Sequence, residues 1–197
     1  MHVGKAMTEN AGSGGGRRRR LWRRAPWVIA ALLVLLPLAT MLFTDGVEWT
    51  VSDFAVLGAM LFGACGAWEL AARMTSNGAY QAAVGVALTT AFILVWINLA
   101  VGIIGSEDDP ANLMYGGVLA VLITGALIAR FQPLGMARAL AATALAQASV
   151  AVIALIAGLG STGPSLFLAG FFATLWLLSA WLFRKAAREQ NPAGAAP

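Results

Sequence analysis

The sequence predicts an all-α, polytopic integral membrane protein: a bundle of six transmembrane helices with both termini on the cytoplasmic side. Three observations lead to this prediction. First, 59% of the 197 residues are hydrophobic and only 11% are charged, whereas a soluble domain has about 25% charged residues. Second, six apolar runs have, or nearly have, the length of about 20 residues that a helix needs to cross a bilayer. Third, the charged residues are distributed unequally between the connections of these runs.

The predicted spans are separated by short connections rich in Gly, Pro, Ser, Thr and Asn. Because lipid offers backbone polar groups no hydrogen-bond partner, each run is expected to be helical. The spans cover residues 26–43, 54–72, 82–105, 113–131, 139–158 and 166–183. They form one transmembrane domain over 25–185, which a cytoplasmic tail at 186–197 follows. The first run is longer than the apolar core of a signal peptide and lacks a convincing cleavage site, so we interpret it as a retained signal anchor.

Basic residues mark the cytoplasmic side of a membrane protein. In the six-span topology all 13 Lys and Arg residues lie on the side of the two termini, and six Asp and Glu residues lie in the opposite loops. A topology with five or seven spans would destroy this segregation. The sequence therefore predicts cytoplasmic termini. Its abundance of Ala, Gly and Arg is typical of a bacterial gene rich in G and C, which places the protein in a bacterial inner (plasma) membrane.

The first 24 residues combine a Gly-rich stretch with a cluster of arginines, and we expect them to be disordered. Basic side chains close to a membrane attract anionic lipid headgroups, each by about 1 kcal/mol. The residues expected to bind headgroups are Arg17, Arg18, Arg19, Arg20, Arg23 and Arg24. A docking arm for a cytosolic protein is the alternative. A nucleic-acid partner is not expected, because the positive charge follows the membrane topology.

Glu69 and Arg73 lie four residues apart at the cytoplasmic end of the second predicted span. This order and spacing favour an ion pair on one face of a helix. An ionisable residue within a membrane span is also a candidate functional group. Two interpretations of Glu69 therefore stay open: a structural ion pair, and a role in proton transfer or substrate binding.

Uncharged polar residues are the other candidates for a site within the membrane. Thr90, Thr124, Gln147 and Thr174 lie at a similar depth in their spans, and Asn98 lies in the outer half of the third span. These side chains could line a path for a substrate, or they could form hydrogen bonds between helices, each worth about 0.6 kcal/mol. Charged residues are absent from the middle of every predicted span, which disfavours ion-coupled transport.

Small residues recur every four positions in the second span, at Ala55, Ala59, Gly63 and Ala67. Small faces allow membrane helices to approach each other closely. The stripe favours packing within the bundle, and an interface with a second copy is the alternative.

No cofactor and no metal site are predicted. The chain has one His and one Cys, too few for a bis-His haem or a His-based zinc site. Polar residues of the predicted outer loops are interpreted as helix caps: Ser52 or Asp53 caps the second span, and Asp109 caps the fourth. A divalent cation bound by these carboxylates is the alternative.

Two stretches, WTVSDF at 49–54 and NLAVGIIGSEDDPANL at 98–113, resemble segments of a family of small, uncharacterised bacterial inner-membrane proteins. The resemblance extends from the second predicted span to the fifth. It implies a membrane location and no chemistry, because that family has no known activity.

The sequence favours a non-enzymatic function, either as an accessory or assembly protein of the membrane or as a sensor of membrane state. The partners would be the lipid bilayer and a membrane protein or a second copy of the chain. A small transporter or channel that uses Asn98, Gln147 and the threonines is the alternative. A third hypothesis is an intramembrane enzyme that acts on lipid, with Glu69 as acid or base.

Overall fold

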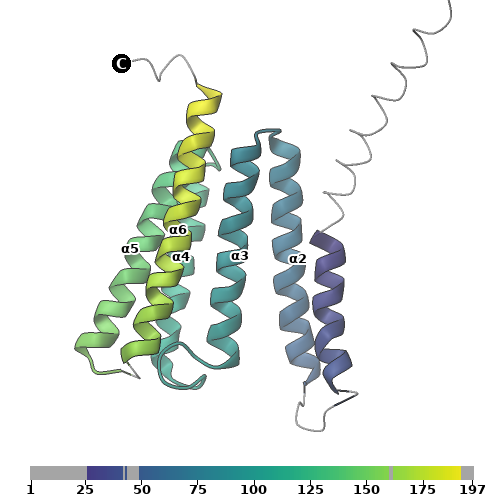
Figure 1. Ribbon diagram of the computed structural model, residues 1–197, viewed down its shortest axis with the longest axis vertical. Coiled ribbons are helices and arrows are strands. Elements are labelled where there is room, and N and C mark those ends of the chain that lie inside the picture. Colours follow the sequence, from purple (N-terminus) through teal and green to yellow (C-terminus); the bar gives the residue numbers. More distant parts are fainter. Residues whose placement is uncertain (1–25, 42, 44–48, 160–161, 192–197) are drawn as a thin grey trace, which may run out of the picture. The chain divides into compact units, whose positions relative to one another are not determined.

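The computed structural model describes residues 26–41, 43, 49–159 and 162–191 of the chain. Within these residues five helices are long and apolar enough to cross a membrane, and a shorter apolar helix covers Pro26–Met41 (Figure 1). These lengths and compositions are those of a multi-pass membrane protein. The N-terminal arginine cluster and the predicted disorder of residues 1–24 lie outside the described residues, as does the second half of the tail, 192–197.

The chain divides into two compact units, Met1–Ala72 and Arg73–Pro197. The first contains the helix Pro26–Met41 and nearly all of α2 (Val51–Met74). Thr50 and Asp53 form a reciprocal cap at the start of α2. The Asp53 carboxylate accepts hydrogen bonds from the backbone N–H and the hydroxyl of Thr50, at 2.7 and 2.8 Å. The capping residue is therefore Thr50, which corrects the prediction of Ser52 or Asp53, and Asp53 contributes by reaching back to it.

In the first unit, the start of the helix Pro26–Met41 lies beside the second half of α2, so the two helices are antiparallel. The Cys65 thiol donates a hydrogen bond to the backbone carbonyl of Pro26 at 3.5 Å. The rings of Trp27 and Phe62 meet edge to face, with centroids 5.6 Å apart. Cys65 shares the buried face of α2 with Leu57 and Leu61, at a spacing of four residues. This spacing places the three side chains on one side of the helix.

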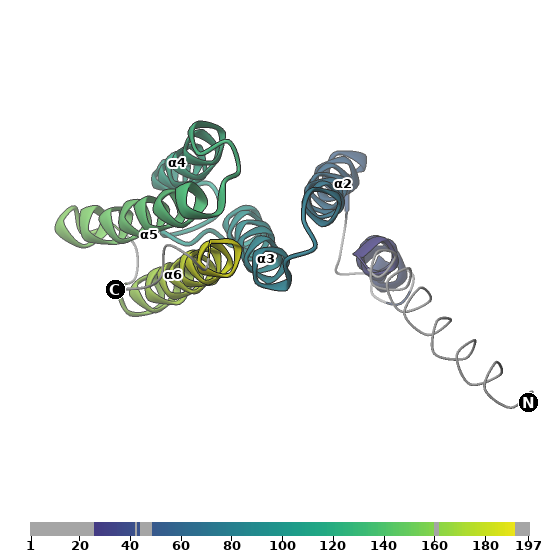
Figure 2. The same ribbon diagram turned by 90° about the horizontal axis from the view of Figure 1, so that it is seen from above.

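The second unit contains α3 (Gly78–Ala100), the short 3₁₀ helix η1 (Pro110–Leu113), α4 (Met114–Ile128), α5 (Pro133–Ile156) and α6 (Thr162–Gln190). Successive long helices run antiparallel. α5 packs against both α4 and α6, and α6 also packs against α3 (Figure 2). We call the end at which α3 begins the Asn77 end, and the end at which α3 finishes the Asn112 end.

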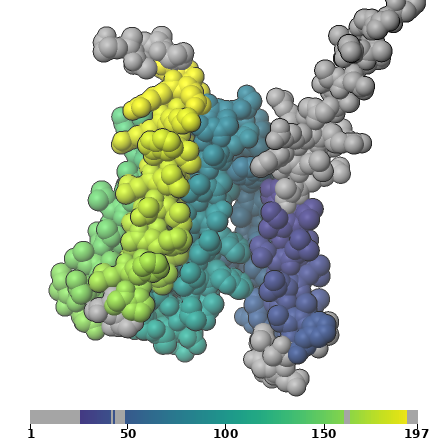
Figure 3. Space-filling model, in the orientation of Figure 1, coloured from purple at the N-terminus to yellow at the C-terminus, as the bar shows by residue number. Residues whose placement is uncertain are grey.

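The core of the second unit has a small-residue side and an aromatic side. Between α4 and α5, a Cβ added to Gly125 would lie 2.7 Å from the Cβ of Ala139, so only glycine permits this close approach. On α6 the side chains of Phe172, Trp176 and Phe183 are fully buried. The α6 side chains lie directly against those of α3 (Figure 3).

Apolar helices lie at the positions of the predicted spans, but several ends differ. α3 stops at Ala100 rather than at residue 105, because residues 101–105 belong to a folded connection. α5 begins at Pro133 rather than at residue 139, with proline in the first turn, where its missing N–H costs nothing. α6 continues to Gln190, past the predicted end at 183, because its charged last turns consist of good helix formers.

Candidate functional site

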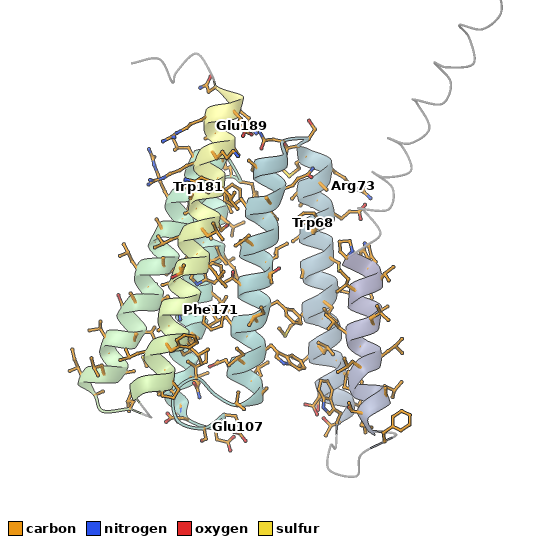
Figure 4. All side chains as sticks on the ribbon, viewed as in Figure 1. Trp68, Arg73, Glu107, Phe171, Trp181 and Glu189 are labelled. Carbon is orange, nitrogen blue, oxygen red and sulfur yellow. The ribbon has the colours of Figure 1, made fainter. Side chains whose placement is uncertain are left out.

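Glu69 belongs to α2, one turn before Arg73, and its side chain is half-buried. Its carboxylate accepts a hydrogen bond from the indole N–H of Trp27 at 3.4 Å. Arg73 is exposed at the end of α2 (Figure 4). The hydrogen bond between Trp27 and Glu69, at 3.4 Å, is long and therefore weak. Glu69 thus has a structural contact with the neighbouring helix, while its carboxylate keeps some access to the surroundings.

The predicted layer of polar residues in the second unit does not converge on one point. Thr90 is fully buried, whereas Thr124 and Thr174 are exposed. The hydroxyls of Thr90 and Thr174 donate to the backbone carbonyls of Val86 and Gly170, one turn earlier, at 2.7 and 2.8 Å. Such bonds satisfy a hydroxyl within its own helix. The threonines therefore face different surroundings and do not line a common path.

Asn98 and Gln147 are also separated. Asn98 lies in the last turn of α3, where its side-chain amide donates to the backbone carbonyl of Asn112 at 3.3 Å. Gln147 lies near the middle of α5 and is fully buried. Asn98 therefore supports the connection at the Asn112 end, and Gln147 belongs to the interior of the unit.

Sequence reasoning missed Asn112, which organises the connection between α3 and α4. Its Oδ1 accepts hydrogen bonds from the backbone N–H groups of Ile103 and Ile104, at 3.0 and 2.9 Å. Its Nδ2 donates to the carbonyls of Ile104 and Ser106, at 3.1 and 2.6 Å. Ser165 of α6 adds a bond from its hydroxyl to the carbonyl of Ile103, at 2.8 Å. One buried amide therefore satisfies four backbone groups of a connection that would otherwise leave them unpaired.

Two glycines give this connection its shape. Gly102 and Gly105 have φ angles of 71° and 67°, in the left-handed region that side chains with a Cβ rarely adopt. In the sequence, the signal for this connection is a pair of glycines that flank two isoleucines. We interpreted this segment as part of the third span, but left-handed glycines at this spacing end α3 and turn the chain.

Gln147 and Trp176 are a second pair that the sequence did not connect. Both side chains have no exposed surface. The two amide atoms of Gln147 and the indole nitrogen of Trp176 have no hydrogen-bond partner among the described residues. Buried polar groups in native proteins are normally paired, so these atoms require an explanation.

The small-residue stripe of α2 lies opposite the buried face of that helix. Ala55, Ala59, Gly63 and Ala67 are all exposed, whereas Leu57 is buried. The stripe therefore does not pack against the helix Pro26–Met41, which occupies the other face. In membranes, such smooth faces are the surfaces through which helices associate.

A similar stripe on α4 escaped the sequence analysis. Gly116, Ala120 and Thr124 follow one another at four-residue spacing and are all exposed. A Cβ added to Gly116 would meet no atom within 4 Å. Thr124, predicted as part of a polar layer, is therefore a member of an outward-facing small-residue surface.

Among the described residues, no group of three His, Cys, Asp or Glu side chains could hold a metal ion. Asp109 caps η1 by accepting a hydrogen bond from the backbone N–H of Ala111 at 2.9 Å, with Pro110 in the first turn, which confirms its predicted role. Glu107 lies at the Asn112 end and Glu189 at the Asn77 end. Glu189 accepts a bond from the Asn77 amide at 2.9 Å.

Comparison with known proteins adds no relative: no protein-family model, no curated protein and no solved structure matches this chain. Its function must therefore be inferred from its own residues.

Proposed function

We propose that this chain is a six-span protein of a bacterial inner membrane, with both termini in the cytoplasm. The segregation of its charges supports this topology. At the Asn77 end of α4, α5 and α6, the exposed basic residues are Arg130, Arg138, Arg184, Lys185 and Arg188. At the Asn112 end, the connection carries Glu107, Asp108 and Asp109. In this topology the N-terminal arginines at 17–24 meet anionic lipid headgroups.

Within that membrane the protein acts as a non-enzymatic accessory or assembly subunit that binds another membrane-spanning protein. The exposed stripe Ala55, Ala59, Gly63 and Ala67 on α2 carries this proposal. In lipid, the hydrophobic effect does not drive helices together, so close packing of small faces is a main source of association. A helix whose small face is not covered within its own unit is suited to receive a partner helix. A second copy of the chain could provide that helix, as could a different membrane protein.

The scattered polar residues support binding over transport. A path across the second unit would need Thr124 and Thr174 to face the interior, and both are exposed. The unpaired amide of Gln147 is the observation that favours the alternative, a small transporter or channel. In that case Gln147→Ala would abolish flux of the substrate without changing insertion into the membrane. The third hypothesis, an enzyme acting on lipid, requires Glu69→Gln to stop turnover.

The experiment that tests the binding proposal is purification of the full chain from its native membrane in mild detergent. Everything that co-elutes is identified and its ratio to the chain is measured. Gly63→Leu and Ala59→Leu place a bulky side chain on the α2 stripe, and we expect either to lower the recovery of partner or oligomer about tenfold, equivalent to about 1.4 kcal/mol. Ala148→Leu makes the same kind of change at an exposed position of α5 and should leave recovery unchanged.

Two results would contradict the proposal. One is a wild-type chain that elutes alone as a monomer under conditions that preserve other membrane complexes. The other is a defined complex that Gly63→Leu and Ala148→Leu affect equally. The latter would leave an accessory function standing but would remove the α2 stripe as its binding surface.

A further inference from the structure

Gln147 on α5 and Trp176 on α6 have more hydrogen-bonding capacity than their surroundings satisfy. Both side chains are fully buried, and neither the amide of Gln147 nor the indole N–H of Trp176 has a partner among the described residues. A glutamine amide carries two N–H donors and an acceptor oxygen, and an indole carries one donor. Lipid cannot supply partners to such groups, so the protein or a bound molecule must do so.

The register of the two helices brings these side chains together. Ala154 of α5 and Ser165 of α6 line the same small cavity at the Asn112 end of their interface. Towards the Asn77 end, Gln147 lies seven residues from Ala154 along α5, and Trp176 lies eleven residues from Ser165 along α6. At 1.5 Å per residue, the two Cα atoms differ in level by about 6 Å.

The tilt of helical side chains closes this difference. Side chains lean towards the N-terminus of their own helix. Because α5 begins at the Asn77 end, Gln147 leans towards that end and thus towards the level of Trp176. α6 begins at the opposite end, so Trp176 leans towards the level of Gln147. The two polar groups therefore reach a similar level, and both belong to the buried faces of helices that pack against each other.

Neighbouring hydroxyls do not resolve the excess of donors. Thr143 lies one turn before Gln147 and is also fully buried, but its hydroxyl already donates to the carbonyl of Ala139 at 2.9 Å. A direct bond from the indole N–H to Gln147 Oε1 would leave both amide N–H donors unused. A molecule that both accepts and donates hydrogen bonds, and that is small enough for a closed interface, would satisfy the remaining groups. Water has these properties, and buried waters commonly bridge groups of this kind.

A small cavity lies near Gln147, towards the Asn112 end of the unit. It is lined by Ala151, one turn from Gln147, and by Tyr115 and Ser165, which bring polar atoms. Its volume of about 10 Å³ is close to the space needed for one water molecule. Gln147 and Trp176 do not line this cavity, so it shows incomplete packing about one turn from Gln147 and not at the amide itself.

We propose that Gln147 and Trp176 form a buried hydration site, which holds one water molecule between α5 and α6. The water accepts from the Trp176 indole and from the Gln147 amide, and it donates to an acceptor oxygen of the same interface. This site is independent of the binding function proposed above, because it lies in the interior of the second unit and not on its surface.

The test is nuclear magnetic resonance of the full chain in detergent micelles, with ¹⁵N-labelled tryptophan. The indole signal of Trp176 is assigned as the one that Trp176→Phe removes. We expect this N–H to show a magnetisation-transfer cross-peak to a long-lived water. Gln147→Leu should abolish the cross-peak and shift the indole proton upfield, because the bound acceptor is lost. The indole of Trp181, which is 58% exposed on the same helix, is the internal control and should not change with Gln147→Leu.

Each other outcome overturns the site. A wild-type Trp176 indole without any cross-peak to water means a dry interface. A downfield indole proton that lacks the water cross-peak and moves in Gln147→Leu means a direct bond between the two side chains. A cross-peak that persists in Gln147→Leu means a water that Gln147 does not hold. If Gln147→Leu does not fold, Gln147→Met offers a similar length without donors, and the wild-type spectrum alone still decides whether a water is present.

Discussion

The hydroxyl of Ser179 on α6 donates a 2.8 Å hydrogen bond to the backbone carbonyl of Ala83 on α3, and Ser179 is fully buried. This bond crosses between two helices, unlike that of Thr90, whose hydroxyl donates within its own helix. One turn further towards the Asn77 end, the rings of Tyr80 and Phe183 meet at right angles with centroids 5.0 Å apart. Together these contacts fix the register of α6 against α3.

Replacing Ser179 by alanine should lower the free energy of unfolding by about 0.6 to 1.7 kcal/mol, the range for hydrogen bonds between membrane helices. Unfolding by SDS in mixed micelles, followed by the loss of packed tertiary signal, measures this change. Ser149→Ala is the matched control, because Ser149 is exposed and its hydroxyl donates to Leu145 within α5. Equal losses in the two variants would show that the bond to Ala83 does not stabilise the unit.

Asn112→Ala should loosen the connection between α3 and α4. It removes four hydrogen bonds and leaves buried backbone groups unpaired, each at a cost of about 1 to 3 kcal/mol. We expect faster hydrogen exchange at the N–H groups of Ile103 and Ile104, and a lower free energy of unfolding. Asp108→Ala, at an exposed position of the same connection, should change neither. Unaltered protection of both isoleucines in Asn112→Ala would contradict this role.

Hydropathy alone predicts where the apolar helices lie, because a helix in lipid must be long and apolar whatever it packs against. Local spacing also predicts the cap at Asp109, since an acidic residue before proline suits a helix start. Both inferences depend on neighbours in the sequence. The end of α3 was misplaced because residues 101–105 are as apolar as a span, yet they form a folded connection in which only Ile103 and Ile104 are buried.

The remaining features depend on residues far apart in the chain. Ser179 and Ala83 are separated by 96 residues, and Tyr80 reaches the carbonyl of Phe131 over 51. Depth within a span, computed from the sequence, grouped Thr90 with Thr124 although one is buried and the other exposed. Depth fixes the level of a residue but not the face of the helix it occupies. Trp176 was overlooked for the same reason, because the sequence does not show that its side chain lies on the buried face of its helix.

Gly102→Ala should destabilise the second unit more than Gly158→Ala. Both glycines have positive φ angles, 71° and 66°, so an alanine at either site is strained by about 1 to 2 kcal/mol. At Gly158 the added Cβ would meet no atom within 4 Å, whereas at Gly102 it would lie 2.4 Å from the backbone oxygen of Ser106. Both variants carry the backbone strain, but only Gly102→Ala also has the clash with Ser106. The difference between their thermal unfolding midpoints therefore measures the clash alone. Similar midpoints would mean that the connection can move aside at no cost.

Gly125→Ala should push α4 away from α5. The new Cβ would lie 2.7 Å from the Cβ and 3.3 Å from the Cα of Ala139, and overpacking of this kind costs about 1 to 3 kcal/mol. Gly117→Ala is the control on the same helix, because its Cβ meets no atom within 4 Å and alanine favours a helix by about 1 kcal/mol.

The double variant Gly125→Ala with Ala139→Gly exchanges the two residues and restores the space between the backbones of α4 and α5. If the close approach is the cause, the loss in Gly125→Ala should be largely recovered when unfolding is measured for all members of the cycle, because residues in contact show coupling energies of about 0.5 to 3 kcal/mol. If the losses of unfolding free energy in the two single variants simply add in the double variant, the contact with Ala139 is not the cause of the effect of Gly125→Ala. Recovery would instead establish that a glycine on α4 and an alanine on α5 set the distance between these helices.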